Sequence, residues 1–406
     1  MTTFANSSTV QVAYVEEATF GVTPTTGATS HFLRVTGESL DFAVTKTPST
    51  EINSTRTISS MIPTSASATG GVNCEVSYKE YDRLLAAALQ SDFSVYGTAG
   101  VGTTFTADFT ATTITADAAP TGASAFTTLQ LGQWFTVNAG STVNSHKLFR
   151  VSTTVAPTST IITLSASTPA TIAAAVPTVS VATSRLTHGI TQKSFTFERQ
   201  ATDISQYFAY RGLTLGGFDL SVSSGALSKL NFTFIGKDAV PSASTTLPGT
   251  IAASEAFEIH SGVAGSACRL WINGVYQPSV FVKTASVKYD NALRSQEAIA
   301  TLGAVSVGSG TINCTGSMEI YLADSTLFSA FVANTPISLA ISSLDADGNG
   351  YVINLPHANL TKVATTAGGK DADMMLAVDY TALRDSANAV PALQKAVIID
   401  RVGVAA

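Results

Sequence analysis

Two segments of this chain, far apart in the sequence, show nearly the same order of residue types. Residues 70–89 read GGVNCEVSYKEYDRLLAAAL, and residues 309–333 read SGTINCTGSMEIYLADSTLFSAFVA. Each segment has a small-residue turn, Asn-Cys, a short alternating stretch and a stretch rich in Leu, Phe and Ala. The Asn-Cys pairs align, which predicts equivalent strand positions for Cys74 and Cys314. A repeat of this kind indicates a duplicated fold.

The other patterns predict a mainly β protein. Residues 216–224 and 227–237 alternate between apolar and polar side chains, which is typical of half-buried strands, and Ser224-Gly225 between them predicts a hairpin turn. Residues 31–46 and 190–200 are also rich in β-branched and aromatic residues.

Helix patterns are sparse. In residues 81–89, Tyr81, Leu84, Leu85 and Ala88 have the spacing of one stripe on a short amphipathic helix. The second copy has a matching stripe that contains Leu327, Phe328 and Phe331, and Asp324 is placed to cap that helix. We therefore expect each copy to be a sheet with one packed helix.

Residues 96–185 have no counterpart in the second copy, and they contain short strand patterns between turns rich in Gly, Pro and Ser. We interpret them as a small inserted β-domain. Residues 239–254 are rich in Pro, Ser and Thr, which predicts a linker. The expected domains are a discontinuous first unit (1–95 and 186–245), the insert (96–185) and a second unit (246–406).

The composition excludes several classes of protein. Charged residues make up 12% of the 406 residues, about half the usual ~25%, and the net charge is −6. Lys and Arg do not cluster, which argues against binding nucleic acid through a basic patch. The sequence shows no signal peptide and no apolar run of the ~18 residues that a membrane helix needs. Synthesis in the cytoplasm is expected.

No motif for catalysis, metal binding or cofactor binding occurs. The five histidines lack Cys, Asp or Glu at ligand spacing, and three cysteines cannot form a complete disulfide framework. Residues 345–350 (DADGNG) begin like a calcium-binding loop, but Pro356 stands where that loop requires Glu, so a β-turn is expected. We expect neither an enzyme nor a cofactor.

Several ordered blocks resemble the major tail tube proteins of long, non-contractile-tailed bacteriophages. They are AYVEEATFGVTP (13–24), LRVTGESLDFAVTKTPSTEINSTRTIS (33–59), the Asn-Cys units, ITQKSFTFERQATDISQYFAYRGL (190–213), residues 293–332 and MMLAVDYTALRDSA (374–387). The resemblance implies two tandem tail-tube β-sandwich or barrel domains, each with one flanking helix. It places the protein in the virion tail, as a structural component assembled in the host cytoplasm.

In this family, rings of tube domains stack into a tube, and strands from neighbouring domains line a continuous lumen. Most members have one tube domain and form hexameric rings, whereas the duplication here implies three chains per ring with pseudo-six-fold symmetry. The implied partners are further copies of the chain, the tape measure, tail terminator and distal tail proteins, and DNA that passes through without specific binding. No membrane is involved.

A long polar segment precedes each Asn-Cys strand, at residues 45–70 and 291–310. In the family such a loop reaches a neighbouring domain or ring. The resemblance therefore points to eight residues for contacts between subunits or rings: Glu51, Arg56, Met61, Ile62, Arg294, Glu297, Ile299 and Leu302. Alternatively, the charged ones only keep the loops soluble.

A different function is also compatible with the sequence. A surface-binding β-protein, such as an adhesin, a decoration protein or a receptor-binding module, would suit the Ser/Thr/Gly-rich composition and the insert. That alternative predicts a monomer or a small oligomer that does not polymerise.

Overall fold

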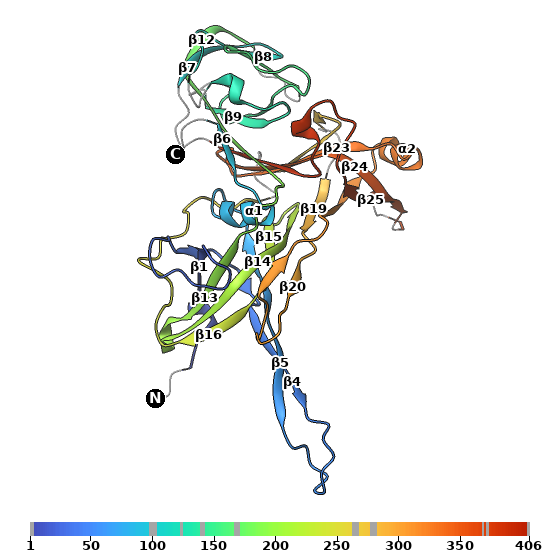
Figure 1. Ribbon diagram of the computed structural model, residues 1–406. Helices are drawn as coiled ribbons and strands as arrows, with labels where there is room; N and C mark the ends of the chain where they lie inside the picture. Colours follow the sequence, from blue (N-terminus) through green and yellow to red (C-terminus); the bar gives the residue numbers. More distant parts are fainter. Residues whose placement is uncertain are drawn as a thin grey trace.

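In the computed structural model, the chain forms two antiparallel β sandwiches, each with one short helix, and a smaller β unit that lies on the second sandwich (Figure 1). The mainly β prediction is confirmed. The structure describes residues 4–96, 104–121, 125–138, 143–165, 171–261, 268–276, 282–367, 369–370 and 373–403.

The first layer of the N-terminal sandwich has the strand order β4, β5, β15 and the C-terminal half of β14, with β3 in line with β4 on β5. Along β15, Leu230, Phe232 and Phe234 are buried and alternate with more exposed residues, as the sequence predicts. The strands are β3 (Gly37–Glu38), β4 (Asp41–Pro48), β5 (Met61–Glu75), β14 (Gln206–Ser223) and β15 (Lys229–Gly236).

The second layer contains β2, β1, β13, the N-terminal half of β14, and β16. Phe197 of this layer contacts Phe234 of the first, with ring centroids 4.9 Å apart. The helix α1 (Asp82–Ala88) packs on β14, and all its residues from Leu84 onward are buried. The strands are β1 (Gln11–Glu17), β2 (His31–Leu33), β13 (Ser194–Ala201) and β16 (Asp238–Ser242).

The C-terminal sandwich repeats this arrangement. One layer has the order β19, β22, β25 and the C-terminal half of β24, and the other contains β18, β17, β23, the N-terminal half of β24, and β26. The elements are β17 (Cys268–Ile272), β18 (Val275–Tyr276), β19 (Val282–Asp290), β22 (Asn313–Tyr321), α2 (Thr326–Val332), β23 (Ile337–Leu344), β24 (Gly350–Ala367), β25 (Met374–Ala382) and β26 (Ile398–Val402).

The two sandwiches share a detailed geometry. β14 and β24 are equally long and run through both layers of their sandwich, with a register shift between Leu215 and Gly217 in one and between Leu360 and Lys362 in the other. A bulge of this kind bends a strand, which allows one strand to serve two layers. The duplicated fold inferred from the repeat is therefore present in the structure.

The alignment of the two Asn-Cys pairs, however, is wrong in three dimensions. Cys74 is the penultimate residue of β5, whereas Cys314 is the second residue of β22. The burial patterns match Cys314 to Ala68, and two closely packed glycines agree with this register: a Cβ on Gly70 would lie 2.3 Å from the Ser39 carbonyl oxygen. A Cβ on Gly316 would lie 2.3 Å from the carbonyl oxygen of Ser286, the equivalent residue.

The segment that was predicted to be an insert has its own hydrophobic core. Residues between Ala107 and Val181 form a cluster separate from the main core, which extends through both sandwiches. Its strands are β6 (Ser94–Tyr96), β7 (Phe105–Phe109), β8 (Thr113–Ala116), β9 (Trp134–Asn138), β10 (Leu148–Arg150), β11 (Ile161–Thr163) and β12 (Ile172–Thr187). The 3₁₀ turns of the chain include Ser7–Thr9, Phe126–Thr128, Thr202–Ile204 and Pro391–Leu393.

The insert is attached to the C-terminal sandwich. Its return strand β12 pairs with β26, and Trp134 contacts Trp271 of β17 with ring centroids 4.5 Å apart. These contacts lie on the face of β23, β24 and β26 where Ala340, Val352 and Val402 are buried. The insert therefore covers the second layer of the C-terminal sandwich and leaves the first layer free.

The sequence predicts a linker at residues 239–254, but the structure shows more than a simple linker there. Residues 238–242 are strand β16, which pairs with β14, and the hydroxyls of Thr245 and Thr246 donate hydrogen bonds to the buried Glu198 carboxylate at 2.7 Å. A buried carboxylate requires donors, and this segment supplies them. The first half of the segment is therefore part of the N-terminal sandwich.

Candidate assembly surfaces

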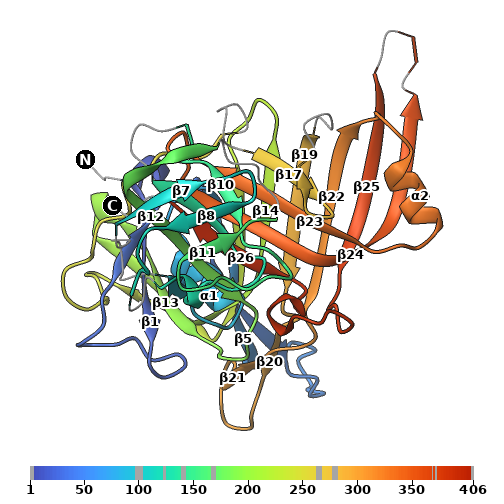
Figure 2. The same ribbon diagram turned by 90° about the horizontal axis from the view of Figure 1, so that it is seen from above.

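The first layers of the two sandwiches are joined edge to edge into one sheet. β14 pairs with β19 from Gly217–Asp290 to Ser223–Thr284, and we call the resulting surface the joined sheet (Figure 2). Phe218 and Tyr289 stack across this junction, with ring centroids 5.6 Å apart and an interplanar angle of 12°. A Cβ on Gly217 would lie 1.9 Å from the Tyr289 carbonyl oxygen, so only glycine fits there.

One face of the joined sheet is packed on the hydrophobic core, and the other face is polar. On the polar face four lysines lie beside or directly opposite a carboxylate on the next strand, whereas Lys46 of β4 lies opposite Pro63. The pairs are Lys229 with Glu75, Lys288 with Asp219, Lys362 with Asp379, and Lys283 with Glu319, whose Nζ and Oε2 are 3.4 Å apart.

Two further carboxylates on this face, Asp41 and Asp290, have no lysine opposite them in the register. Partial burial raises the pKa of Asp219, and the nearby Lys288 opposes that shift. The remaining positions are mainly Ser, Thr, Asn and Ala. The polar face is therefore balanced to slightly acidic, and it offers no positively charged track to a polyanion.

The joined sheet has two edges without a partner in the described part of the chain. One is the outer edge of β24 from Lys362 onward, and the other is the outer edge of β3 and β4. By strand order, β24 is the equivalent of β14, and β3 with β4 is the equivalent of β19. The two free edges thus correspond to the two edges that are paired at the internal junction.

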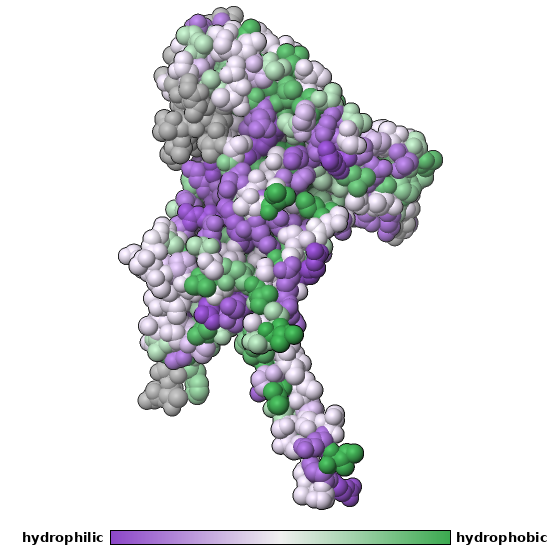
Figure 3. Space-filling model, viewed as in Figure 1, coloured by the Kyte–Doolittle hydropathy of each residue, from purple (hydrophilic) through white to green (hydrophobic). Residues whose placement is uncertain are grey.

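The first of the two long polar segments forms a hairpin of β4 and β5 that projects from the body of the molecule (Figure 1). Met61 and Ile62 are 58% and 61% exposed, and Ile52 near the tip is 98% exposed. Figure 3 shows apolar side chains at this end of the hairpin. They are exposed in the single chain, so they contribute no hydrophobic stabilisation there.

Glu51 and Arg56 lie in the loop between these strands and are exposed. Glu51 accepts a hydrogen bond from Ser59 at 3.0 Å, and Arg56 is in the left-handed region with φ 59°. The Asn53 side chain organises the turn: it accepts from Thr55 and donates to the Thr57 carbonyl at 2.6 Å. The four residues predicted in this segment thus lie on one projecting hairpin.

The second polar segment forms a separate short hairpin of β20 (Arg294–Gln296) and β21 (Ser306–Gly308). Arg294, Glu297, Ile299 and Leu302 are exposed, and Ile299 is 100% exposed. The base of this hairpin is fixed to the N-terminal sandwich, because the Asn291 amide donates to the carbonyls of Ala88 at 2.7 Å and Leu215 at 3.3 Å. The structure therefore does not bring the two predicted groups of residues together.

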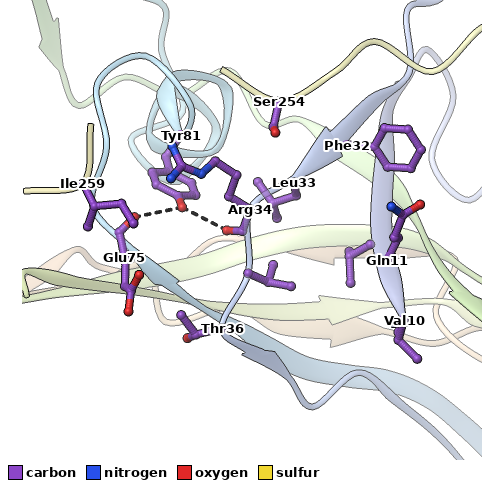
Figure 4. A pocket seen from close by; sticks show the side chains of 12 residues that line it. Val10, Gln11, Phe32, Leu33, Arg34, Thr36, Glu75, Tyr81, Ser254 and Ile259 are labelled. Atoms are coloured by element: carbon purple, nitrogen blue, oxygen red, sulfur yellow. Dashed lines mark hydrogen bonds between the residues drawn. The ribbon is translucent and has the colours of Figure 1, made fainter. Parts of the chain in front are cut away.

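A cavity of about 360 Å³ lies between β1, the end of β5 and residues 254–259, with Tyr81 and Arg34 in its wall (Figure 4). The Tyr81 hydroxyl lies 2.9 Å from the carbonyl oxygens of Arg34 and Glu75, and burial raises its pKa above the ordinary value. The hydroxyl is thus used to tie backbone segments together, and no acid–base pair faces it.

No group of three or more potential metal ligands occurs among the residues that the structure describes. Burial raises the pKa values of Cys74 and Cys314 to about 12, so both are buried thiols of low reactivity. Asp345 accepts hydrogen bonds from the backbone of Asp347 and Asn349, which confirms the predicted β-turn at residues 345–350. None of the described helices is long and apolar enough to cross a membrane.

A sandwich pair with one polar, edge-exposed sheet and a projecting hairpin is an architecture suited to assembly. The phage tail tube protein family model matches residues 7–382, which is nearly the whole chain. The chain belongs to this family, and it is a structural component of a phage tail tube. The comparison with curated proteins gave no significant match.

Sequence reasoning did not find the residues of the internal junction. Gly217, Phe218 and Tyr289 lie in stretches with the same alternating pattern as the other strands. No local sequence pattern indicates which strands are neighbours in the sheet. The alternation of Asp219 and Ser221 with buried residues does indicate a polar face. Pairing between distant strands depends on the whole topology, which the sequence pattern leaves open.

Proposed function

We propose that three copies of this chain form a ring, that rings stack into the tube of a long non-contractile tail, and that DNA passes through the lumen. The observation that carries the proposal is the β14–β19 junction together with the two free edges equivalent to it. If β24 of one subunit pairs with β3 and β4 of the next as β14 pairs with β19, each subunit extends the joined sheet. Repeating the step three times closes it into a barrel with pseudo-six-fold symmetry.

The matched bulges supply the register of this contact. Lys362 corresponds to Gly217, and Ala43 corresponds to Asp290, so Lys362 is expected opposite Ala43 and Val363 opposite Phe42. Val363 and Phe42 would then form an apolar pair at the place of Phe218 and Tyr289. Val363 is 9% exposed, and Phe42 is partly buried against the same core.

In this ring the polar face of the joined sheet lines the lumen. Four lysines on that face have a neighbouring carboxylate, and carboxylates still outnumber lysines. Phosphates would therefore slide past without the counterion release that gives basic surfaces their affinity for DNA. The insert, on the other layer, would decorate the outside of the tube.

The proposed domains are 1–95 with 186–245, the insert 96–185, and 246–406. Within them, the hairpin residues Glu51, Arg56, Met61 and Ile62 are proposed to contact the adjacent ring. Arg294, Glu297, Ile299 and Leu302 of the second hairpin are proposed to contact a neighbouring subunit or ring. Further proposed partners are the tape measure, tail terminator and distal tail proteins, and the site of assembly is the host cytoplasm.

The test is negative-stain electron microscopy of the purified protein over a range of concentrations, with averaged end-on views. Hollow rings or tubes with three-fold symmetry and six similar lobes are expected. A protein that remains monomeric at every concentration, and also in the presence of a tail initiator complex, would overturn the proposal in favour of a surface-binding module.

A further inference from the structure

The C-terminal turn of α1 is covered by the base of the second hairpin. The Asn291 amide donates to the Ala88 carbonyl, and the Gln90 amide donates to the Ser309 hydroxyl at 2.5 Å. Asn291 directly follows the last residue of β19, so the same segment that joins β14 also covers the end of α1. Residues 189–191 cover the same end, because the backbone amides of Gly189 and Thr191 donate to the carbonyls of Leu89 and Gln90 at 2.8 and 2.9 Å. Ala88 is completely buried beneath these segments.

The C-terminal turn of α2 has the same backbone geometry. The residues after the helices, Gln90 and Asn334, both adopt left-handed φ values, of 53° and 48°. The backbone amide of Ser91 donates to the Ala86 carbonyl at 3.0 Å, and that of Thr335 donates to the Ala330 carbonyl at 2.9 Å. The two turns therefore superpose residue by residue, with Val332 in the place of Ala88.

The α2 turn nevertheless lacks the cover that the α1 turn has. Val332 is 69% exposed and Phe328 is 44% exposed, whereas Leu84 and Ala88 of α1 are fully buried. Within α2, Leu327 is the buried residue. An apolar turn is thus left in solvent at the end of the joined sheet that carries the free edge of β24.

The register of the joined sheet identifies the segment that corresponds to Asn291. Asp290 pairs with Asn313, and Ala43 pairs with Ser67, the residue of β5 that matches Asn313. Ala43 is therefore the counterpart of Asp290, and Val44 is the counterpart of Asn291. Val44 is 37% exposed in the single chain.

We propose that the C-terminal turn of α2, at Val332 and Phe328, is the docking site for the base of the first hairpin, at Val44, of a second copy of this chain. This inference rests on the proposed ring and specifies a contact within it. At the contact between chains, the side chains of Val44 and Val332 meet at the place where, within one chain, the Asn291 amide donates to the Ala88 carbonyl. Because both valines are exposed in the single chain, the contact buries apolar surface only on assembly.

The test is disulfide trapping with the double variant Val44→Cys/Val332→Cys, assembled and then treated with a mild oxidant. Covalent dimers and trimers are expected on a non-reducing gel. All variants carry Cys268→Ser. The matched controls are the single variants Val44→Cys and Val332→Cys, which should remain monomeric on the gel, because the remaining native thiols Cys74 and Cys314 are buried.

A charge exchange gives a second measurement. Val332→Lys and Val44→Asp should each raise the concentration needed for assembly at least tenfold, and the combination should recover most of that loss. Unfolding of the isolated variants should be unchanged, since both side chains point to solvent. Rings or tubes that form without cross-linking and tolerate both charges would overturn this inference alone; a chain that never forms rings would overturn it together with the proposed function.

Discussion

The Arg185 guanidinium and the Asp400 carboxylate form a two-pronged ion pair, with Nε–Oδ1 and Nη2–Oδ2 distances of 2.7 and 2.8 Å. The side chains are 1% and 0% exposed. Arg185 lies on β12, the return strand of the insert, and Asp400 lies on β26 of the C-terminal sandwich. Asp400 also accepts a hydrogen bond from the Trp134 backbone at 3.0 Å. A buried charge pair thus attaches the insert to the sandwich.

Removing one partner of this pair should be strongly destabilising. Asp400→Asn leaves the guanidinium buried without its counter-charge, and a loss of about 3–5 kcal/mol in the free energy of unfolding is expected. The measurement is chemical denaturation followed by tryptophan fluorescence, since Trp134 and Trp271 lie beside the pair. The double variant Arg185→Met/Asp400→Leu should be less destabilised than Asp400→Asn, and equal or greater loss in the double variant would contradict this account.

His260 should make the stability of the protein sensitive to acid. Burial lowers its pKa to about 4, and its ring packs against Ser343 and Tyr351 of the C-terminal sandwich. The folded state resists protonation and the unfolded state, with a pKa near 6.5, does not. His260 therefore does not lower the free energy of unfolding above about pH 6.5. As the pH decreases from 6.5 toward 4, the free energy of unfolding falls by up to about 3 kcal/mol.

The measurement for His260 is the free energy of unfolding at several pH values between 7 and 4. His260→Gln, which keeps a hydrogen-bonding side chain, should flatten the profile over this range. Part of the slope should remain, because burial also lowers the pKa of His31 to about 4. An unchanged slope in the variant would show that His260 does not titrate as described.

Gly217 should be essential for the junction between the sandwiches. Gly217→Val places a side chain where the Tyr289 carbonyl already lies, so β14 and β19 must separate at this point, at a cost of at least about 2 kcal/mol. Thermal unfolding measures the effect. Ser221→Val, on the same strand and the same face, is the matched control and should have little effect; equal destabilisation by both would argue against a specific close approach.

The projecting hairpin should matter for stacking and not for folding. Met61→Asp/Ile62→Asp introduces charge at two exposed apolar positions, so the free energy of unfolding should change by less than about 0.5 kcal/mol. Electron microscopy should then show single rings in place of tubes. Thr112→Asp, at an exposed position of the insert, is the control for added charge, and normal tubes from the Met61/Ile62 variant would exclude a role of these residues between rings.

The sequence was sufficient for the elements whose patterns are local. The alternation in residues 227–237 and the apolar stripe at residues 81–89 correspond to β15 and α1. Asp324 accepts a hydrogen bond from the Thr326 backbone at 2.8 Å, as expected for a capping side chain, although Ser325 is the capping residue.

Features that depend on long-range pairing could not be obtained in this way. The two Asn-Cys dipeptides predict that Cys74 aligns with Cys314. In the structure Gly70 aligns with Gly316, because each lies against a neighbouring carbonyl group. The first polar segment projects, whereas the second is fixed at its base by Asn291. The Asn291 amide donates to carbonyl groups on α1 and β14, and no local sequence pattern indicates these contacts. The interface residues of both hairpins stay predictions.

The two hairpins of one chain are unequal: the first projects and the second is held at its base by Asn291. A ring of three such chains therefore presents three prongs to the ring beside it, at 120° intervals. A ring of six identical domains would present six prongs at 60° intervals. If rings of three chains form as proposed, two successive rings have three symmetry-equivalent rotational settings, whereas rings of six identical domains would have six.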